Sequence, residues 1–227
     1  MTMPTALVLG ASRGLGLEFA RQYLADGWTV YATHRSEPDR VRLRDLGAHT
    51  LRLDVLDADD LAGLAWQLES ERLDVVVINA GVYGPRSSNL QQPPATEDFD
   101  LVMHTNVLAA MRLVPRLAPM LGPARGTLAF VSSRMGSISA AGASHGMLYR
   151  VSKAAENMVA KLAHVELSPL GVRVLALHPG WVRTDMGGPN AEVDVPASIV
   201  GMRRVIADAT AYPAGGFYDY RGQALAW

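Results

Sequence analysis

The sequence predicts an α/β protein built on one doubly wound parallel sheet of about seven strands, with helices on both faces. Short apolar runs rich in β-branched residues alternate with helical patterns along the whole chain, which is typical of repeated strand and helix units. The run at 73–78 ends in four consecutive apolar residues, VVVI, as expected for a strand buried on both faces. No stretch has the composition of a linker, so residues 1–227 are expected to form a single domain.

Hydrophobic periodicity and turn residues place the individual elements. Strands are expected at 5–9, 28–33, 49–53, 73–78, 126–132, 172–178 and 217–220. Helices are expected at 17–25, 38–46, 56–70, 96–121, 149–168 and 197–209. Pro115 and Pro119 are expected to kink or fray the second half of the long fourth helix. The segment 187–196, made of Gly, Pro, Asn and acidic residues, indicates a mobile loop, and 186–210 is expected to supply a substrate loop and helix.

The composition excludes several classes of function. Hydrophobic residues make up 49% of the chain and the net charge is −1, so neither nucleic acid nor a membrane surface is expected as a partner. Because the sequence has no cysteine, disulfides, thiol nucleophiles and thiolate metal sites are excluded. The N-terminal segment has no basic region and no apolar run is long enough to span a bilayer, which predicts a cytoplasmic location.

A glycine-rich turn follows the first strand. In GASRGLG, Gly10, Gly14 and Gly16 stand between that strand and the first helix. Glycines let the backbone approach a phosphate closely, and the free N–H groups of a helix start favour negative charge. Three glycines after a strand also make an ordinary tight turn, so nucleotide binding and a simple turn both stay open from this loop alone.

The end of the second strand bears on the choice of cofactor. In a dinucleotide-binding fold the adenosine ribose lies there, and an acidic residue selects the free 2′-hydroxyl of NAD. This chain has His34 and Arg35 instead, with Arg13 in the glycine turn, which favours the 2′-phosphate of NADP. The alternative is a pair of ordinary surface arginines.

Further polar residues follow the fourth and fifth strands. Small residues at Asn79-Ala80-Gly81 would let a flat ligand lie against the strand end, although a simple turn explains them equally well. Asn106 lies inside a predicted helix, and its buried amide either ties that helix to the next strand or serves a water at the active site. Ser133 ends the fifth strand. Because ligands collect beyond the carboxyl ends of strands in open α/β sheets, Ser133, Asn79 and Gly10 are expected to share one rim.

The most specific chemical signal is the pair Tyr149 and Lys153. A spacing of four puts the phenol and the ammonium on one face of a helix. A cation about 4–6 Å from a phenol lowers its pKa toward the working range, so that Tyr149 could exchange a proton with a carbonyl or alcohol oxygen. Such pairs also occur on ordinary amphipathic helices. A chance match is less frequent here because the only lysines are Lys153 and Lys161.

Together these elements resemble the short-chain dehydrogenase/reductase family over essentially the whole chain. The motifs that carry the resemblance occur in the family's order: GASRGLG, Asn79-Ala80-Gly81, Asn106, Ser133 with Tyr149 and Lys153, and Pro179-Gly180. The stretches SSRMGSI, YRVSKAAENM and FYDYRGQALAW look like the carbonyl-reductase-like branch that includes C-signal proteins. The resemblance implies a Rossmann-type fold and a homo-oligomer, a dimer or tetramer packed through the helices near 97–121 and 149–168.

The resemblance also implies roles for individual residues. Tyr149 would be the general acid/base and Lys153 would lower its pKa and hold the nicotinamide ribose. Ser133, rather than Ser132, would orient the substrate oxygen, and Asn106 would anchor a water in a proton relay. The remaining implied cofactor contacts are Gly10, Ser12, Arg13, Gly14, Leu15, Gly16 and Arg35 at the phosphates, Asp54 and Val55 at the adenine, Asn79, Ala80 and Gly81 at the adenosine side, Pro179 and Gly180, and Val182 and Thr184 at the carboxamide.

One departure from the family pattern concerns the glycine turn. The family commonly has Thr where Leu9 stands in this chain. One hydrogen bond that braces the turn is therefore missing, and Ser12 is expected to compensate for it.

The leading hypothesis is an oxidoreductase that interconverts a carbonyl compound and its alcohol, with NADP(H) preferred over NAD(H). No metal is required, because Lys153, Tyr149 and Ser133 already polarise the carbonyl. The wall of an apolar or aromatic pocket, or alternatively plain core packing, would come from Met135, Ile138, Met147, Trp181 and Met186. A redox sensor that binds NADP(H) with little turnover is the alternative, which the complete polar set disfavours. An epimerase or dehydratase is disfavoured by the glycine spacing and the short C-terminal part.

Overall fold

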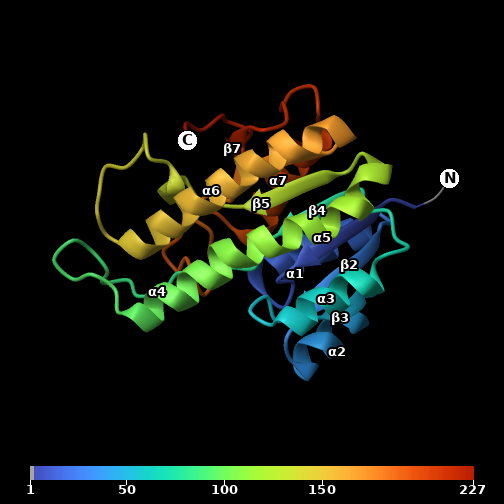
Figure 1. The fold of residues 1–227 in the computed structure, drawn as a ribbon, viewed down its shortest axis with the longest axis horizontal. Helices are drawn as coiled ribbons and strands as arrows, with labels where there is room; N and C mark the ends of the chain where they lie inside the picture. Colours follow the sequence, from blue (N-terminus) through green and yellow to red (C-terminus); the bar gives the residue numbers. More distant parts are fainter. Residues whose placement is uncertain (1–2) are drawn as a thin grey trace.

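Seven parallel strands form one sheet in the computed structural model, which describes residues 3–227. The strand order is β3-β2-β1-β4-β5-β6-β7, and every neighbouring pair is parallel. Helices cover both faces of this sheet (Figure 1). The predicted doubly wound, Rossmann-type architecture is therefore confirmed, and the order reverses next to β1, where such folds bind their ligands.

The observed bounds lie close to the predicted ones. The strands are β1 (Thr5–Leu9), β2 (Thr29–His34), β3 (His49–Arg52), β4 (Val75–Ile78), β5 (Thr127–Val131), β6 (Arg173–His178) and β7 (Phe217–Asp219). The helices are α1 (Gly14–Ala25), α2 (Glu37–Asp45), α3 (Ala58–Gln67), α4 (Thr96–Met103), α5 (Ala109–Ala124), α6 (Met147–Leu167) and α7 (Val195–Ala207). Single turns of other helix types are the π turn η1 (His104–Leu108) and the 3-10 turns η2 (Arg134–Gly136) and η3 (Ser168–Leu170).

The two faces of the sheet bury separate apolar layers. Along β1, Leu7 and Leu9 join the layer under α3, α5 and α6, whereas Ala6 and Val8 join the layer under α1, α2 and α7. Side chains alternate between the two faces of a strand, so a strand covered on both faces must be apolar at every position. This explains why the central strands have no polar side of their own.

The long helix α5 does not fray as its prolines suggested. It continues through Pro115, Pro119 and Pro123 to Ala124, three residues beyond the predicted end. The three prolines are four residues apart and all are exposed, so they lie on one solvent face. Each proline leaves a carbonyl of the preceding turn without its helical donor, but on this face water can replace that donor.

The segment 187–196 is more structured than a simple mobile loop. Val193 N donates to Trp181 O and Arg183 N donates to Val193 O, both at 2.9 Å, while Ala191 is only 3% exposed. These bonds pair the segment with the chain that leaves β6. The segment predicted to be a mobile loop is therefore hydrogen-bonded to a neighbouring part of the chain. No helix among residues 3–227 combines the length and the apolar character needed to cross a bilayer.

Candidate active site

The glycine turn is braced by the two strands that flank β1. Gly10, with a φ of 76°, donates its N–H to Thr33 Oγ1 at 2.9 Å, and its carbonyl accepts from Asn79 Nδ2 at 2.8 Å. Thr33 is buried at the end of β2, and Asn79 follows β4. The missing brace at Leu9 is thus replaced by Thr33 and Asn79, and not by Ser12 as expected.

The residues of this turn fit the phosphates of a dinucleotide. A Cβ on Gly16 would lie 2.1 Å from Gly10 O, so α1 starts directly against the turn. The helix begins after Arg13 with no side-chain cap and no acidic residue in its first turn, which leaves its first N–H groups to an outside acceptor. These donors open on a groove of about 210 Å³ lined in part by Gly14, Asn79 and Thr184. Free N–H groups at a helix start in a groove are a favourable site for a phosphate.

Most of the cofactor contacts implied by the sequence line this groove. They are Gly10, Ser12, Arg13, Gly14, Leu15, Arg35, Val55, Asn79, Ala80, Gly81 and Thr184. Asp54 does not line the groove, and its Oδ1 accepts a hydrogen bond from Leu56 N at 3.0 Å. Gly16 serves the turn by packing against Gly10. The Asp54 assignment is thus not supported by this geometry.

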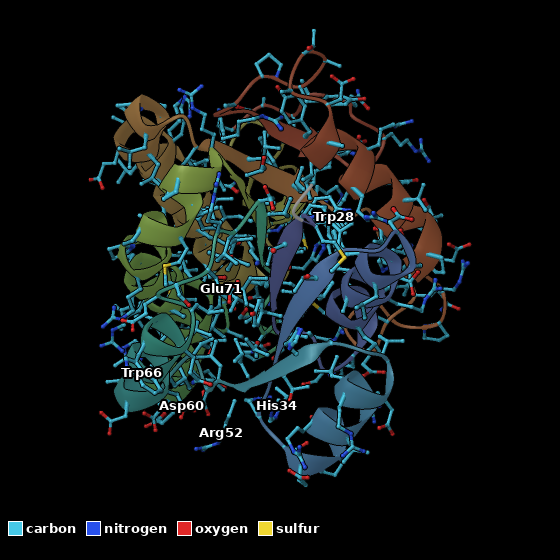
Figure 2. All side chains as sticks on the ribbon, turned by 90° about the vertical axis from the view of Figure 1, so that its right-hand side faces the viewer. Trp28, His34, Arg52, Asp60, Trp66 and Glu71 are labelled. Atoms are coloured by element: carbon cyan, nitrogen blue, oxygen red, sulfur yellow. The ribbon has the colours of Figure 1, made fainter. Side chains whose placement is uncertain are left out.

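Basic side chains gather where the groove passes the end of β2. Arg35 is exposed and lines the groove beside His34. Figure 2 shows His34 near Arg52 and Asp60 at this edge of the sheet; His34 and Arg52 are register partners, and Arg52 forms an ion pair with Asp60 at 3.4 Å. The guanidinium of Arg52 is therefore paired with the Asp60 carboxylate. Among the described residues, no ion pair involves Arg35.

Tyr149 lies in the first turn of α6 and is held there by residues far away in the sequence. The helix begins at Met147, whose N–H donates to Ser88 O at 3.1 Å, and the N–H of Leu148 donates to Ser88 Oγ at 3.3 Å. The Tyr149 ring stacks on Tyr83, with centroids 4.5 Å apart. Tyr149 is only 7% exposed yet lines a cleft beside the groove.

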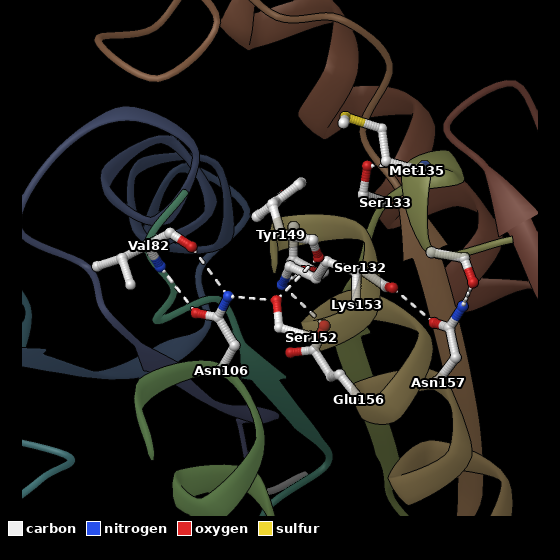
Figure 3. Close-up of polar contacts among 12 residues, drawn as sticks. Val82, Asn106, Ser132, Ser133, Met135, Tyr149, Ser152, Lys153, Glu156 and Asn157 are labelled. Atoms are coloured by element: carbon white, nitrogen blue, oxygen red, sulfur yellow. Dashed lines mark hydrogen bonds and ion pairs between the residues drawn. The ribbon is translucent and has the colours of Figure 1, made fainter. Parts of the chain in front are cut away.

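Lys153 lies below Tyr149 on the same helix, as the spacing predicted. Its Nζ is 5.9 Å from the centre of the Tyr149 ring. The same Nζ donates to Val131 O at 3.0 Å. It also donates to Glu156 Oε2 at 2.7 Å (Figure 3). Lys153 is therefore held between the end of β5 and a carboxylate on its own helix.

The pKa of Tyr149 departs from the expectation. Burial raises the pKa of the phenol above its ordinary value; Lys153 opposes this rise, Glu156 adds to it, and a hydrogen bond with Ser133 opposes it. The lowering effect of Lys153 is thus present but does not prevail in this structure. Two effects that the sequence analysis left out, desolvation and the Glu156 carboxylate, outweigh it.

The side-chain amide of Asn106 links two parts of the chain by hydrogen bonds, which is the first of the two roles expected for it. In the π turn η1, its Oδ1 accepts from Val82 N at 2.8 Å, and its Nδ2 donates to Val82 O and to Ser152 Oγ, both at 2.9 Å (Figure 3). The amide joins the segment after β4 to α6, instead of the next strand, β5. Both of its N–H bonds are used, so its part in a proton relay stays a prediction.

The two serines after β5 have different partners. Ser132 donates its hydroxyl to Asn157 Oδ1 at 2.5 Å and is 2% exposed. Ser133 Oγ accepts from Met135 N at 3.1 Å, and it faces Tyr149 closely enough to affect the phenol. The geometry favours Ser133 over Ser132 for contact with a substrate.

The cleft on the far side of Tyr149 has a volume of about 940 Å³. Of the predicted wall residues, Met135, Trp181 and Met186 line it. Ile138 is 78% exposed, and neither it nor Met147 is in the lining. The remaining predicted cofactor contacts, Pro179, Gly180 and Val182, line this cleft and not the groove.

Charged side chains also reach this cleft. Arg86, Arg134, Arg150 and Arg221 line it together with the carboxylates of Glu192 and Asp219. Burial lowers the pKa of His178, at the end of β6, to about 4, although Asp219 opposes this effect. The imidazole of His178 is therefore neutral at physiological pH.

The comparisons with known proteins agree with this geometry. Residues 4–194 match the family model for short chain dehydrogenases. The protein belongs to the short-chain dehydrogenase/reductase family. It is 39% identical to C-signal of Myxococcus xanthus over 158 residues, which are 68% of this chain and 93% of that protein. As an oxidoreductase of this family it falls in the carbonyl-reductase-like branch, as its sequence motifs predicted.

Two solved structures resemble the whole chain. The carbonyl reductase Sniffer of D. melanogaster is 29% identical and superposes with a TM-score of 0.92, with all of both chains covered. A carbonyl reductase from Pseudomonas aeruginosa PAO1 in complex with NADP is 34% identical, with a TM-score of 0.83 and the same full coverage. The second structure is thus a carbonyl reductase of similar fold that holds NADP.

Three features of the site were missed at the level of sequence. Thr33 was not recognised as the brace of the glycine turn, nor Tyr83 as the ring stacked on Tyr149, since neither residue belongs to a motif: Thr33 lies within β2 and Tyr83 in the loop after Asn79-Ala80-Gly81. Glu156 left a weaker signal, because KAAE places a carboxylate one turn from Lys153. Asking which charged side chains share the buried face of that helix could have found it.

Proposed function

We propose that the protein is an NADP(H)-dependent oxidoreductase that interconverts a carbonyl compound, an aldehyde, ketone or quinone, and its alcohol. The observation that carries this proposal is the position of Tyr149. It lines the open cleft together with Ser133. The cleft adjoins the groove, because Leu15, Thr184 and Met186 line both, so a cofactor in the groove and a substrate in the cleft could meet beside the phenol. NADPH in the groove would supply the hydride.

The chain's own residues would handle the proton. Tyr149 would donate its hydroxyl proton to the carbonyl oxygen, and in the reverse direction the phenolate would accept the proton of the alcohol. Ser133 would hold the same oxygen by a hydrogen bond. Lys153, 5.9 Å from the ring centre, would stabilise the negative charge that appears when the proton leaves.

Two further parts of the site would complete it. Arg35 beside the groove would bind the 2′-phosphate and so favour NADP(H) over NAD(H). The segment 186–210 would close one side of the substrate cleft, since Met186 and Glu192 already line it.

We also propose a homo-oligomer. Along α6 the side chains of Val151, Met158, Leu162 and Val165 are each at least half exposed and follow one helix face. Met111 on α5, a helix packed against α6, is also exposed. An apolar stripe of this kind is favoured at a contact between subunits.

NADPH oxidation against a panel of aldehydes, ketones and quinones tests the proposed activity. Wild type, Tyr149→Phe and the control Tyr212→Phe are compared, because Tyr212 follows α7 and lines neither the groove nor the cleft. The proposal is supported if wild type and Tyr212→Phe both turn over a substrate and Tyr149→Phe does not, although it still binds NADPH. Tight NADPH binding without turnover of any substrate would instead favour the redox sensor.

A further inference from the structure

Glu156 is a buried carboxylate for which the proposed reaction has no use. It lies on α6 and is only 1% exposed, and the Lys153 side chain that it contacts is 5% exposed. Burying a carboxylate is costly even when it is paired, and an apolar residue of similar size often serves stability as well. Its position, 2.7 Å from the ammonium of Lys153, is therefore a reason to look for a role in the chemistry.

The surroundings of this ion pair contain few other charges. Tyr149 is the titratable neighbour on the same helix, and Tyr83 stacks on it from the loop after β4. Ser133 faces Tyr149 from the end of β5. Asn106 Oδ1, from η1, lies with Lys153 Nζ beside Gly81. Both residues are uncharged. The charged or titratable groups farther out, along the cleft, are Arg86, Arg134, His145, Arg150, His178, Glu192, Asp219, Tyr220 and Arg221.

A charge count shows what the carboxylate does to the phenol. Burial raises the pKa of the Glu156 carboxyl, and the Lys153 ammonium, 2.7 Å away, opposes that rise and favours the ionised form. With Glu156 ionised, Lys153 charged and Tyr149 protonated, the buried group is neutral as a whole. If Tyr149 loses its proton, one uncompensated negative charge is left in a desolvated place, which is unfavourable. Without Glu156 the same loss would produce a neutral pair of phenolate and ammonium. Burial, first, and Glu156 both raise the pKa of Tyr149, and Lys153 opposes them.

The contacts of Lys153 complete the argument. Its Nζ is fixed by Val131 O and Glu156 Oε2, and burial, which alone would lower its pKa, is outweighed by Glu156 and Tyr149 so that its pKa is raised. The ammonium thus stays charged and stays in place. The ammonium lies 2.7 Å from the Glu156 carboxylate but 5.9 Å from the centre of the Tyr149 ring. Its positive charge is therefore compensated mainly by Glu156, which leaves less of it to stabilise a phenolate.

We propose that Glu156 is a positioning residue that holds Lys153 against β5 and keeps Tyr149 protonated, so that the site serves as a proton donor in carbonyl reduction over a wide pH range. In each turnover the proton of Tyr149 passes to the substrate oxygen and is replaced from solvent. Alcohol oxidation, which needs the phenolate, is confined to a higher pH. This inference rests on the proposed function, because it assumes that Tyr149 transfers the proton.

The test compares two variants that remove the charge with two that keep it. Glu156→Gln preserves a hydrogen-bonding group beside Lys153, and Glu156→Met removes it, so one can serve if the other does not fold. Glu156→Asp keeps the charge. Glu166→Gln repeats the first substitution at an exposed position of the same helix. The first readout is ultraviolet difference titration of the phenolate with the Tyr149→Phe spectrum subtracted. The second is the pH dependence of kcat/KM for carbonyl reduction at saturating NADPH.

The expected result is a phenol that titrates lower by about one pH unit or more in Glu156→Gln and Glu156→Met. Reduction requires the protonated phenol, so the pH above which kcat/KM for reduction falls moves down by the same amount. Above that pH, kcat/KM falls about tenfold per pH unit. Glu156→Asp shifts less, and Glu166→Gln does not shift.

Unchanged titration of Tyr149 in both charge-removing variants overturns the inference, because a merely structural Glu156 would alter melting and kcat without moving the pH profile. The titration does not depend on turnover. A shifted titration in an enzyme that reduces no carbonyl compound would therefore refute the proposed function while leaving the effect of Glu156 on Tyr149 in place.

Discussion

Replacing Gly16 by alanine is the sharpest structural test of the nucleotide-binding turn. The new Cβ would lie 2.1 Å from Gly10 O and 2.7 Å from Asn79 Nδ2, well inside the 3.0 Å below which Cβ contacts essentially do not occur. One neighbour is backbone, so the start of α1 must move away from the turn. That movement also disturbs the bond from Asn79 to Gly10.

The cost can be worked from these contacts. Overpacking of this kind costs about 1–3 kcal/mol, and a weakened hydrogen bond adds about 1 kcal/mol. For a chain of this length the sum corresponds to a fall in Tm of about 4–16 °C. Because the displaced N–H groups are those offered to the phosphates, the affinity for NADPH should fall with the stability.

Gly63→Ala is the matched control for this substitution. Gly63 lies inside α3, and a Cβ there would meet only Gln67 Nε2, at 3.8 Å. Alanine in a helix interior is favoured over glycine by about 0.5–1 kcal/mol, so this variant should melt slightly higher and bind NADPH as wild type does. Thermal melting and NADPH fluorescence titration measure both effects. If Gly16→Ala matched wild type in melting and in NADPH affinity, the reasoning about the turn would be wrong.

Two other predictions concern the cofactor and the oligomer. Arg35→Ala should weaken NADPH binding about tenfold to a hundredfold and leave NADH nearly unchanged, because only NADPH carries the 2′-phosphate. Arg52→Ala, at the same edge but paired with Asp60, should spare both cofactors, and equal losses for NADPH and NADH in Arg35→Ala would contradict the role of Arg35. Leu162→Glu places a charge in the exposed apolar stripe of α6 and should shift wild-type oligomers toward monomers in sedimentation velocity. A wild type that sediments as a monomer, or a variant with the same mass as an oligomeric wild type, would contradict the proposed interface.

The fold was predictable because its signals are local. A strand buried on both faces is apolar throughout, and polar residues such as Asn79 and Ser133 stand where such strands end. Parallel strands bring those ends to one edge, so residues far apart in the sequence were placed together correctly. The four-residue spacing of Tyr149 and Lys153 predicted their shared face in the same way.

What escaped prediction depends on burial, which periodicity reports only coarsely. Glu156 is one turn from Lys153 in the sequence, but nothing there shows that both are enclosed and that desolvation outweighs the cation at Tyr149. The prolines of α5 illustrate the converse. They are harmless because all of them face solvent, and a rule that ignores exposure predicts a frayed helix.

The most direct test of the whole account is a single-turnover measurement of NADPH oxidation with a carbonyl substrate that wild type reduces, in wild type and in Tyr149→Phe. General acid catalysis contributes about 10²–10⁴ in rate, so the variant should lose a factor of that size while its NADPH dissociation constant stays unchanged. A Tyr149→Phe enzyme that oxidises NADPH at the wild-type rate would contradict the central claim that this phenol supplies the proton.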